Sequence, residues 1–383
     1  MYFRLNPECY YIKGDMTGAI YDLIDGDVYA LNSQECRTIE VCEDNGLVDP
    51  EDPFLCELKQ RTLGTFYEKR VFIEKIRLGS PIAEYQQGKP PFLARAFLEI
   101  GNSCDRSCWY CGNNGLSRSM GCFGCNIWDE KGSPVDINRW KELIDELHRL
   151  NCQSLFIKGG DLSRDRGKTR EILEYANQQF EKIFIIGHKT HFSPEDCDYL
   201  KNKANLIIQT DSLSDIDNRH LYLLITDYHE SRELPEKLPD NAILDIVSRN
   251  FDSLQPDSPL NSKKKIMKTN LERFTHNNKL HPCLANSVTI AWNGEVLPCP
   301  MMRKQSLGNI RDRKLWTFLK GQPDSIQEFW KINLNTLKKC GTCEFRYVCT
   351  DCRALETAKT GDLYAKVLCN YDPSKGMWQQ QDA

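Results

Sequence analysis

The sequence predicts an α/β protein built on an open, partial barrel of parallel strands, with a small unit before the barrel and a cysteine-rich segment after it. Two observations carry this prediction. Strand-like apolar runs alternate with helical patterns from about residue 92 to residue 250. Seven of the 18 cysteines lie between Cys283 and Cys369. Because only six strands are predicted, fewer than the eight of a closed barrel of roughly 250 residues, we expect a partial (β/α)6 barrel.

Residues 1–80 are expected to form a winged-helix-like module. Strand-like apolar runs occupy 8–12, 19–24 and 28–31. Helical patterns follow over 33–44 and 53–63. Asp25-Gly26 provides the tight turn of a hairpin, and Ser33 is expected to cap the first helix. The glycines and prolines of 79–91 predict a linker to the barrel.

Residues 92–250 carry the elements of the barrel. The predicted strands are 97–100, 155–157, 183–186, 206–208, 221–225 and 243–247, and the predicted helices are 136–150, 170–180 and 194–201. Asp136 is expected to cap the first of these helices. Residues 251–280, which include Lys263-Lys264-Lys265, predict a polar linker that is either a loop or one short helix. A hairpin around Asn293-Gly294 then opens the segment 281–375.

Composition narrows the classes of function. Lys and Arg total 50 against 54 Asp and Glu, a net charge of −4, which disfavours nucleic acid as a partner. The mean hydropathy is −0.54, and neither a membrane-spanning run nor a signal layout is evident, so we expect a cytoplasmic protein without a membrane partner. In such a protein closely spaced cysteines indicate metal or cluster ligands rather than disulfides.

Three cysteines follow the first predicted barrel strand, at Cys104, Cys108 and Cys111. Active sites of α/β barrels lie at this carboxyl edge of the strands. Three thiolates leave one iron of a [4Fe–4S] cluster open, whereas a structural zinc site would require four closed positions. The CxxxCxxC spacing resembles that of the radical S-adenosylmethionine (SAM) superfamily. The resemblance implies a cluster that cleaves SAM to a 5′-deoxyadenosyl radical, with the three cysteines as catalytic ligands.

The same resemblance implies further SAM contacts. Tyr110 resembles the aromatic residue that packs on the adenine. Gly159-Gly160-Asp161 resembles the Gly-Gly-Glu motif that holds the methionyl amino group, with aspartate in place of glutamate. Gln209, Thr210 and Ser212 are candidates for ribose contacts. The alternative interpretation of these positions is ordinary turn and loop polarity.

The C-terminal cysteines resemble a SPASM domain, which carries two auxiliary [4Fe–4S] clusters and would bring the total to three. Their positions are Cys283, Cys299, Cys340, Cys343, Cys349, Cys352 and Cys369. The family pattern implies one cluster on Cys340, Cys343, Cys349 and Cys369, and another on Cys283, Cys299 and Cys352. The last spacing departs from the family pattern, because two residues rather than three separate Cys349 from Cys352. Two zinc ribbons are the alternative.

Cys122 and Cys125 have no place in either motif. They could supply a missing cluster ligand, act as a thiol near the radical, or pack in a loop. His281, next to Cys283, is a weaker candidate for the missing ligand.

The N-terminal module resembles the PqqD-like element that binds a leader peptide as an added strand. Together the resemblances imply a maturase of ribosomally made peptides that abstracts a hydrogen atom and installs a thioether or carbon–carbon crosslink. The implied partners are a precursor peptide with a leader, an electron donor such as flavodoxin or ferredoxin, and an ATP-grasp ligase acting on the same peptide. A peptide epimerase, a sulfatase-maturing type of enzyme and a non-enzymatic zinc-binding adaptor remain as alternatives.

Overall fold

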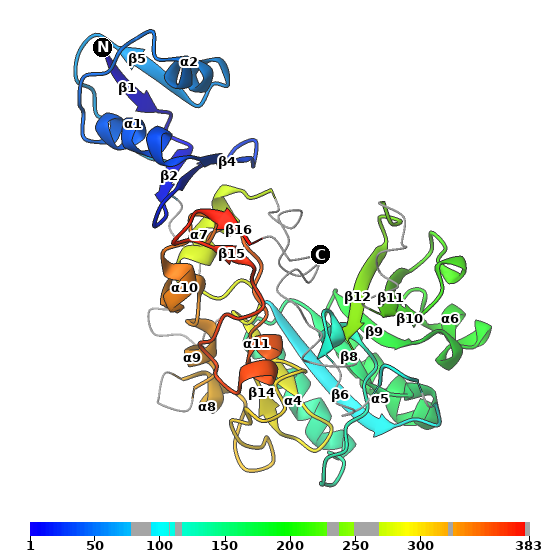
Figure 1. Cartoon of the computed structure of the whole chain (residues 1–383). Coiled ribbons are helices and arrows are strands. Elements are labelled where there is room, and N and C mark those ends of the chain that lie inside the picture. The colour runs from blue at the N-terminus through cyan, green and yellow to red at the C-terminus, as the bar shows by residue number, and fades with distance from the viewer. Residues whose placement is uncertain are drawn as a thin grey trace. The chain divides into compact units, whose positions relative to one another are not determined.

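The computed structural model describes residues 1–77, 93–106, 108–111, 117–227, 237–248, 268–320 and 325–379 (Figure 1). The chain forms two compact units, and each is assembled from separate stretches of sequence. The first unit contains 1–84, 255–283 and 331–383, and the second contains 85–254 and 284–330. The expected linker at 79–91 and the run Lys263-Lys264-Lys265 lie outside the described residues.

A nine-stranded sheet organises the second unit (Figure 1). Its strands, in spatial order, are β14 (Val296–Leu297), β13 (Ser287–Ile290), β6 (Arg95–Ser103), β8 (Leu155–Gly160), β9 (Ile183–His188), β10 (Asn205–Thr210), β11 (Leu221–Asp227), β12 (Ala242–Ser248) and β7 (Ser117–Arg118). The six strands from β6 to β12 in this order are all parallel to their neighbours. The predicted open, parallel α/β sheet is therefore confirmed.

The two edges of this sheet were not predicted. Strand β13 pairs in parallel with β6, and β14 pairs antiparallel with β13, so the expected hairpin around Asn293-Gly294 forms but extends the barrel sheet. At the other edge β7 pairs antiparallel with β12. Part of the segment expected to form the cysteine-rich domain thus belongs structurally to the barrel unit.

Helices lie along the sheet (Figure 1), and the buried residues of α4 and α5 are almost all apolar. They are α4 (Ile137–Arg149), α5 (Arg166–Asn177) and α6 (Pro194–Leu200), with α8 (Trp316–Leu319) and α9 (Gln327–Trp330) in the later segment of the unit. Asp136 caps α4 as predicted, because its side chain accepts the Arg139 amide. Helix α5 begins four residues earlier than predicted, since Asp165 caps it by accepting the Lys168 amide. None of the helices among the described residues combines the length and apolarity needed to cross a membrane.

The first unit begins with two small sheets. Strand β1 (Tyr2–Leu5) pairs with β5 (Gly64–Tyr67), and β2 (Cys9–Lys13), β3 (Gly18–Asp22) and β4 (Val28–Leu31) form an antiparallel sheet. Helices α1 (Ser33–Glu43) and α2 (Pro53–Gln60) follow β4. The predicted cap of α1 was wrong by one residue: Asn32 accepts the Gln34 and Glu35 amides, whereas the Ser33 hydroxyl donates to the Met16 carbonyl.

The remainder of the first unit comes from the far end of the chain. Its elements are α7 (Leu271–Lys279), α10 (Lys338–Gly341), α11 (Arg353–Thr360), β15 (Tyr371–Asp372) and β16 (Met377–Trp378). One apolar cluster joins the N-terminal strands, through Ala19, Tyr21 and Leu23, to Phe274 and to the C-terminal residues Phe345, Tyr347, Val348 and Tyr371. The two ends of the sequence therefore share a single core.

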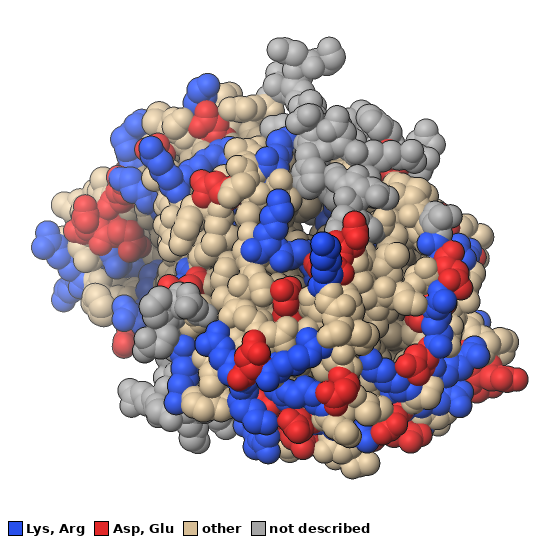
Figure 2. Space-filling view, turned by 90° about the horizontal axis from the view of Figure 1, so that it is seen from below, with Lys and Arg blue, Asp and Glu red and all other residues tan. Residues whose placement is uncertain are grey.

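Charged side chains are mixed on the face of the molecule shown in Figure 2. Lys and Arg alternate there with Asp and Glu, and no broad area of one sign stands out. This distribution agrees with the small net charge of the chain.

Candidate functional site

The three-cysteine loop starts where strand β6 ends, at the carboxyl edge of the sheet. Cys104 is the residue after β6, and its sulfur accepts a hydrogen bond from the Arg106 amide at 3.4 Å. A turn brings the Cys111 amide to 3.1 Å from the Cys108 carbonyl. All three thiols are partly exposed. The structure thus places the three cysteines in one loop at the edge where α/β barrels hold their active sites.

Tyr110 packs inward beside these cysteines. Its ring is 2% exposed and lies in an apolar cluster with Phe97 and Phe156, against which Cys108 and Cys111 also pack. Burial, followed by the nearby Cys108, raises the pKa of Tyr110 above its ordinary value. The buried Tyr110 hydroxyl has no hydrogen-bond partner among the described residues. An orphaned buried hydroxyl marks a place where a bound polar group would be stabilised.

Gly159 and Gly160 end strand β8 with φ angles of +127° and +63°. A Cβ atom on Gly159 would lie 2.2 Å from the Gly101 carbonyl oxygen, and one on Gly160 would lie 2.5 Å from the Ser103 carbonyl oxygen. Glycine is therefore required at both positions for the ends of β6 and β8 to approach each other. This packing accounts for the two glycines without a ligand, in agreement with the alternative interpretation of a structural turn.

Asp161 follows these glycines and caps the short 3₁₀ helix η2 (Leu162–Asp165). Its Oδ1 accepts the Ser163 amide at 3.0 Å and the Ser163 hydroxyl at 2.7 Å, while the Asp161 amide donates to the Ser103 carbonyl. The structure gives Oδ2 no hydrogen-bond partner among the described residues. One carboxylate oxygen therefore remains available to accept a ligand donor.

His191 joins this site without having been predicted. It ends the 3₁₀ helix η3 (Lys189–His191), which follows strand β9, and its Nε2 lies 3.7 Å from the Cys104 sulfur. Burial lowers the pKa of His191, so the ring is neutral near pH 7. Its position just beyond the end of a parallel strand was the signal available in the sequence.

Arg118, which was also missed, organises the polar side of the site. The buried guanidinium donates to Asp245 through Nε at 2.8 Å and Nη2 at 2.5 Å, to Asn126 at 2.6 Å, and to the side-chain oxygen of Gln209 at 3.2 Å. Its charge also lies 5.5 Å from the centre of the Tyr110 ring. The predicted ribose candidate Gln209 is thus held by Arg118 through its carbonyl oxygen.

The other two ribose candidates lie in the turn after β10. The Thr210 hydroxyl donates to Asp215 and accepts the Ser212 amide, and the Ser212 hydroxyl contacts that of Ser214 at 2.8 Å. These bonds give both hydroxyls a structural role in the turn, and they neither support nor exclude a ribose contact.

Cys125 packs beside the three-cysteine loop, whereas the Cys122 backbone lies in the adjacent turn. Cys125 is buried in the same apolar cluster as Tyr110, and burial raises its pKa to about 12. The Cys122 carbonyl accepts a hydrogen bond at 2.9 Å from Lys158, whose side chain is fully buried. Of the two unassigned cysteines, the structure therefore brings Cys125 closest to the predicted radical chemistry.

Arg118→Met is expected to destabilise the barrel unit strongly. The change removes the guanidinium and leaves the Asp245 carboxylate buried without its cation, which typically costs about 3–5 kcal/mol. Thermal unfolding followed by circular dichroism should show a midpoint several degrees below that of the wild type. Arg219→Met is the matched control, because Arg219 pairs with Asp217 at the surface, where an ion pair contributes about 0–1 kcal/mol. Equal midpoints for the two variants would contradict this assignment.

The C-terminal cysteines are divided between the two units. Cys299 belongs to the barrel unit, and the other six belong to the first unit. Burial raises the pKa values of Cys340, Cys349 and Cys352 to about 12, so as free thiols they would be neutral near pH 7. A cationic metal centre is the partner that would hold them as thiolates. No three His, Cys, Asp or Glu side chains in the described part of the chain are grouped as ligands of a single metal ion.

A buried ionic network accompanies these cysteines. Asp351 lies between Cys349 and Cys352 and accepts hydrogen bonds from Arg353 at 2.5 and 2.7 Å, from Lys366 at 3.0 Å, and from His281 at 3.1 Å. Lys366 also pairs with Glu356 at 2.9 Å. The other ring nitrogen of His281 accepts the Cys283 amide at 2.9 Å. Both nitrogens of His281 are engaged, so the structure gives no support to His281 as a cluster ligand.

Residues 282–353 match the family model of SPASM, an iron–sulfur cluster-binding domain. The match includes six of the seven C-terminal cysteines, all except Cys369. The same chain also contains the three-cysteine loop at the carboxyl edge of a parallel sheet. The chain therefore carries a SPASM domain.

Similarity to individual proteins is more limited. The AdoMet-dependent heme synthase of Methanosarcina barkeri (strain Fusaro / DSM 804) is 36% identical over 99 residues, which are 24% of this chain and 25% of the heme synthase. The chain thus spans about a quarter of the length of that curated relative.

Solved structures of SuiB from Streptococcus suis align with 96% of this chain and 100% of their own. The structures are SuiB alone, SuiB bound to the precursor peptide SuiA and SuiB bound to S-adenosylmethionine. Their sequence identities to this chain are 10%, 11% and 10%, and their TM-scores are 0.45, 0.46 and 0.43. These values are too low to support a functional argument.

Proposed function

We propose that this protein is a radical SAM maturase that takes a hydrogen atom from a ribosomally made precursor peptide and installs a thioether or carbon–carbon crosslink. The observation that carries the proposal is the Cys104, Cys108 and Cys111 loop at the carboxyl edge of the sheet, in a chain that also contains a SPASM domain. The proposed functional regions are 1–80 for peptide recognition, 92–250 for the radical chemistry and 281–375 for auxiliary clusters, with 251–280 as a linker.

The residues of the loop fit a [4Fe–4S] cluster with one open iron. Cys104, Cys108 and Cys111 would hold the cluster, and SAM would occupy the space bordered by Tyr110 and the Gly159-Gly160 backbone. The orphaned Tyr110 hydroxyl and Asp161 Oδ2 support this placement. When bound, the cluster supplies one electron that cleaves SAM into methionine and the 5′-deoxyadenosyl radical, which removes a hydrogen atom from the peptide.

A thioether crosslink removes two hydrogens from the peptide. One leaves carbon as the hydrogen atom that completes 5′-deoxyadenosine, and the other leaves sulfur as a proton. The remaining electron needs an acceptor, which is the role we assign to an auxiliary cluster. The proposed ligand sets are Cys340, Cys343, Cys349 and Cys369 for one cluster and Cys283, Cys299 and Cys352 for the other.

The N-terminal sheet offers an edge for a leader peptide. Strand β4 pairs with β3 on one side only, and no backbone hydrogen bond reaches its other side among the described residues. The opposite edge strand, β2, is partly covered, because Lys75 donates to the Cys9 carbonyl at 2.7 Å. An open edge strand is a template for an added strand, which makes β4 the proposed site of leader binding.

The proposed partners follow from this reaction. They are the precursor peptide with its leader, a flavodoxin or ferredoxin that delivers the first electron, and an ATP-grasp ligase that acts on the same peptide. A cytoplasmic location would bring all of them together.

Anaerobic reconstitution is the experiment that tests the proposal. We expect about twelve irons per chain, as three [4Fe–4S] clusters require, and formation of 5′-deoxyadenosine after addition of dithionite and SAM. Iron and sulfide are measured colorimetrically, and 5′-deoxyadenosine is measured by liquid chromatography. Zinc without SAM cleavage would overturn the proposal and favour a zinc-binding adaptor.

A peptide epimerase is the second candidate, and the position of Cys125 favours it. The buried Cys125 thiol, next to the three-cysteine loop, would return a hydrogen atom to the peptide radical from the opposite face. The thiyl radical left on Cys125 would then take one electron from an auxiliary cluster and one proton from solvent to restore the thiol. Epimerisation leaves the peptide mass unchanged, whereas a crosslink removes two hydrogens. In D₂O an epimerase would add one deuterium at the α-carbon, and Cys125→Ala would abolish this label. Mass spectrometry of the substrate peptide therefore separates the two functions.

A further inference from the structure

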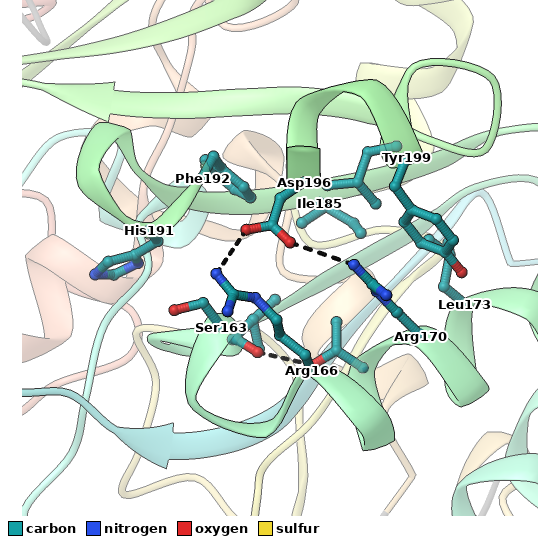
Figure 3. A pocket seen from close by; sticks show the side chains of 12 residues that line it. Ser163, Arg166, Arg170, Leu173, Ile185, His191, Phe192, Asp196 and Tyr199 are labelled. Atoms are coloured by element: carbon teal, nitrogen blue, oxygen red, sulfur yellow. Dashed lines mark hydrogen bonds and ion pairs between the residues drawn. The ribbon is translucent and has the colours of Figure 1, made fainter. Parts of the chain in front are cut away.

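His191 lies between the proposed catalytic cysteine loop and a surface pocket. On one side its Nε2 is 3.7 Å from the Cys104 sulfur. On the other side the ring lines a pocket whose walls include Ser163, Phe192 and Asp196 (Figure 3). Only 5% of His191 is exposed, so its ring forms a wall between solvent and the sulfur.

The hydrogen bonds of His191 determine which ring nitrogen carries the proton. The His188 backbone amide donates to Nδ1 at 3.3 Å, and a nitrogen that accepts a hydrogen bond cannot also carry a proton. Because Nδ1 is the acceptor, the ring hydrogen lies on Nε2, the atom that faces Cys104. His191 is a donor to this sulfur, in addition to the Arg106 amide at 3.4 Å.

The charged residues that line the pocket pair with one another. Asp196, at the start of α6, pairs with Arg166 at 2.9 Å and with Arg170 at 3.6 Å, and these contacts tie α6 to α5 across the pocket (Figure 3). Both carboxylate oxygens of Asp196 and both guanidinium groups are used in these pairs. Because Arg166 and Arg170 already pair with Asp196, we assign no ligand to this pocket.

We propose that His191 is a positioning residue that donates an N–H···S hydrogen bond to Cys104 and thereby raises the reduction potential of the cluster held by that cysteine. The inference rests on the proposed function, because it requires a cluster on Cys104. Hydrogen bonds to the sulfurs are among the factors that set the potentials of iron–sulfur clusters. A donor withdraws electron density from the ligand sulfur, and this stabilises the reduced cluster, which carries one more negative charge.

Three substitutions of His191 distinguish the effect of its N–H donor from the effect of its side chain as a barrier between the pocket and Cys104. His191→Phe and His191→Leu remove the donor and keep a side chain between the pocket and Cys104, whereas His191→Gln keeps an N–H donor. Tyr199→Phe is the matched control, because Tyr199 lines the same pocket and its hydroxyl donates to Glu174 on the protein surface. All are prepared as the full chain with its clusters reconstituted.

The readout is the midpoint potential from a redox titration monitored by electron paramagnetic resonance. The cluster with the open iron is identified as the one whose spectrum changes when SAM is added. We expect a more negative midpoint for the Phe and Leu variants, and a midpoint near that of the wild type for His191→Gln and Tyr199→Phe. Iron content measured in parallel verifies that the variants are loaded.

Two results would overturn the inference. One is an unchanged midpoint in the Phe and Leu variants. The other is an equal shift in the Phe, Leu and Gln variants, which would assign the effect to packing instead of the donor. A failure of the proposed function would differ from both, since the wild type itself would then show no cluster signal that responds to SAM.

Discussion

Cys104→Ala is expected to abolish the reductive cleavage of SAM while the auxiliary iron stays in place. Cys104 is one of only three protein ligands proposed for the catalytic cluster, and it lies in the barrel unit, directly after β6. With two cysteines left, the cluster should not assemble. The iron content should fall from about twelve to about eight per chain, which corresponds to the loss of one [4Fe–4S] cluster. Iron analysis and the 5′-deoxyadenosine assay measure the two effects on the same sample.

Cys197→Ala is the matched control for this experiment. Cys197 is a partly exposed thiol on α6 that belongs to neither proposed cluster motif. Its removal should change neither the iron content nor the yield of 5′-deoxyadenosine. Continued formation of 5′-deoxyadenosine by Cys104→Ala would refute the assignment of the catalytic cluster.

Asp351→Asn is expected to destabilise the first unit by about 3–5 kcal/mol, the range typical for breaking a buried ion pair. Asp351 is fully buried and pairs with Arg353 and Lys366, which are also buried. The amide is nearly the same size as the carboxylate, but it removes the negative charge and leaves two cations to share Glu356. Because this network lies between cluster cysteines, we also expect a lower content of auxiliary iron.

The loss of stability caused by Asp351→Asn should become smaller at low pH. Burial alone would raise the pKa of Asp351, but Lys366, His281 and Arg353 outweigh burial and hold the pKa well below its usual value. A lowered pKa contributes stability above the unfolded-state value of about 3.9 and loses it as the pH falls toward the folded-state value. The difference in unfolding midpoint between wild type and variant should therefore be constant from about pH 6 to 8 and shrink below about pH 4.

Glu57→Gln provides the comparison for Asp351→Asn. Glu57 pairs with Arg61 one helical turn away, and both side chains are about half exposed. Such a pair contributes about 0–1 kcal/mol, so this variant should unfold close to the wild-type midpoint at every pH. A similar loss of stability in both variants would mean that the buried network has no special role.

Local sequence patterns predicted the elements of the fold but not all of their pairings. Each of the six parallel strands appears where a short apolar run stands in the sequence, and the Asp136 cap of α4 could be read from adjacent residues. Strand β13 was expected only as half of a hairpin, yet it also pairs with β6, whose paired residues lie 192 positions earlier in the chain. Apolar alternation shows that a strand is buried without showing which strand lies beside it.

In the candidate site, too, local sequence patterns predicted neighbours within one loop but not contacts between distant residues. Cysteine spacing alone identified the proposed ligands, because all three lie within one loop. Arg118 and its partner Asp245 are 127 positions apart, and His191 is 87 positions from Cys104. A lone buried arginine or histidine has no local pattern that distinguishes it from a surface residue. Only the pairing of distant strands into one sheet brings these groups together.

The shared core of the first unit has a consequence for biogenesis. Tyr21 packs against Phe274 and Tyr347, and its hydroxyl donates to the Glu344 carbonyl. A ribosome adds roughly 5–20 residues per second, so the N-terminal strands wait on the order of half a minute for these partners. During translation the apolar face of β3 is thus left uncovered while the barrel is being made. We expect the first unit to fold after chain release, and its cysteines to receive iron only then.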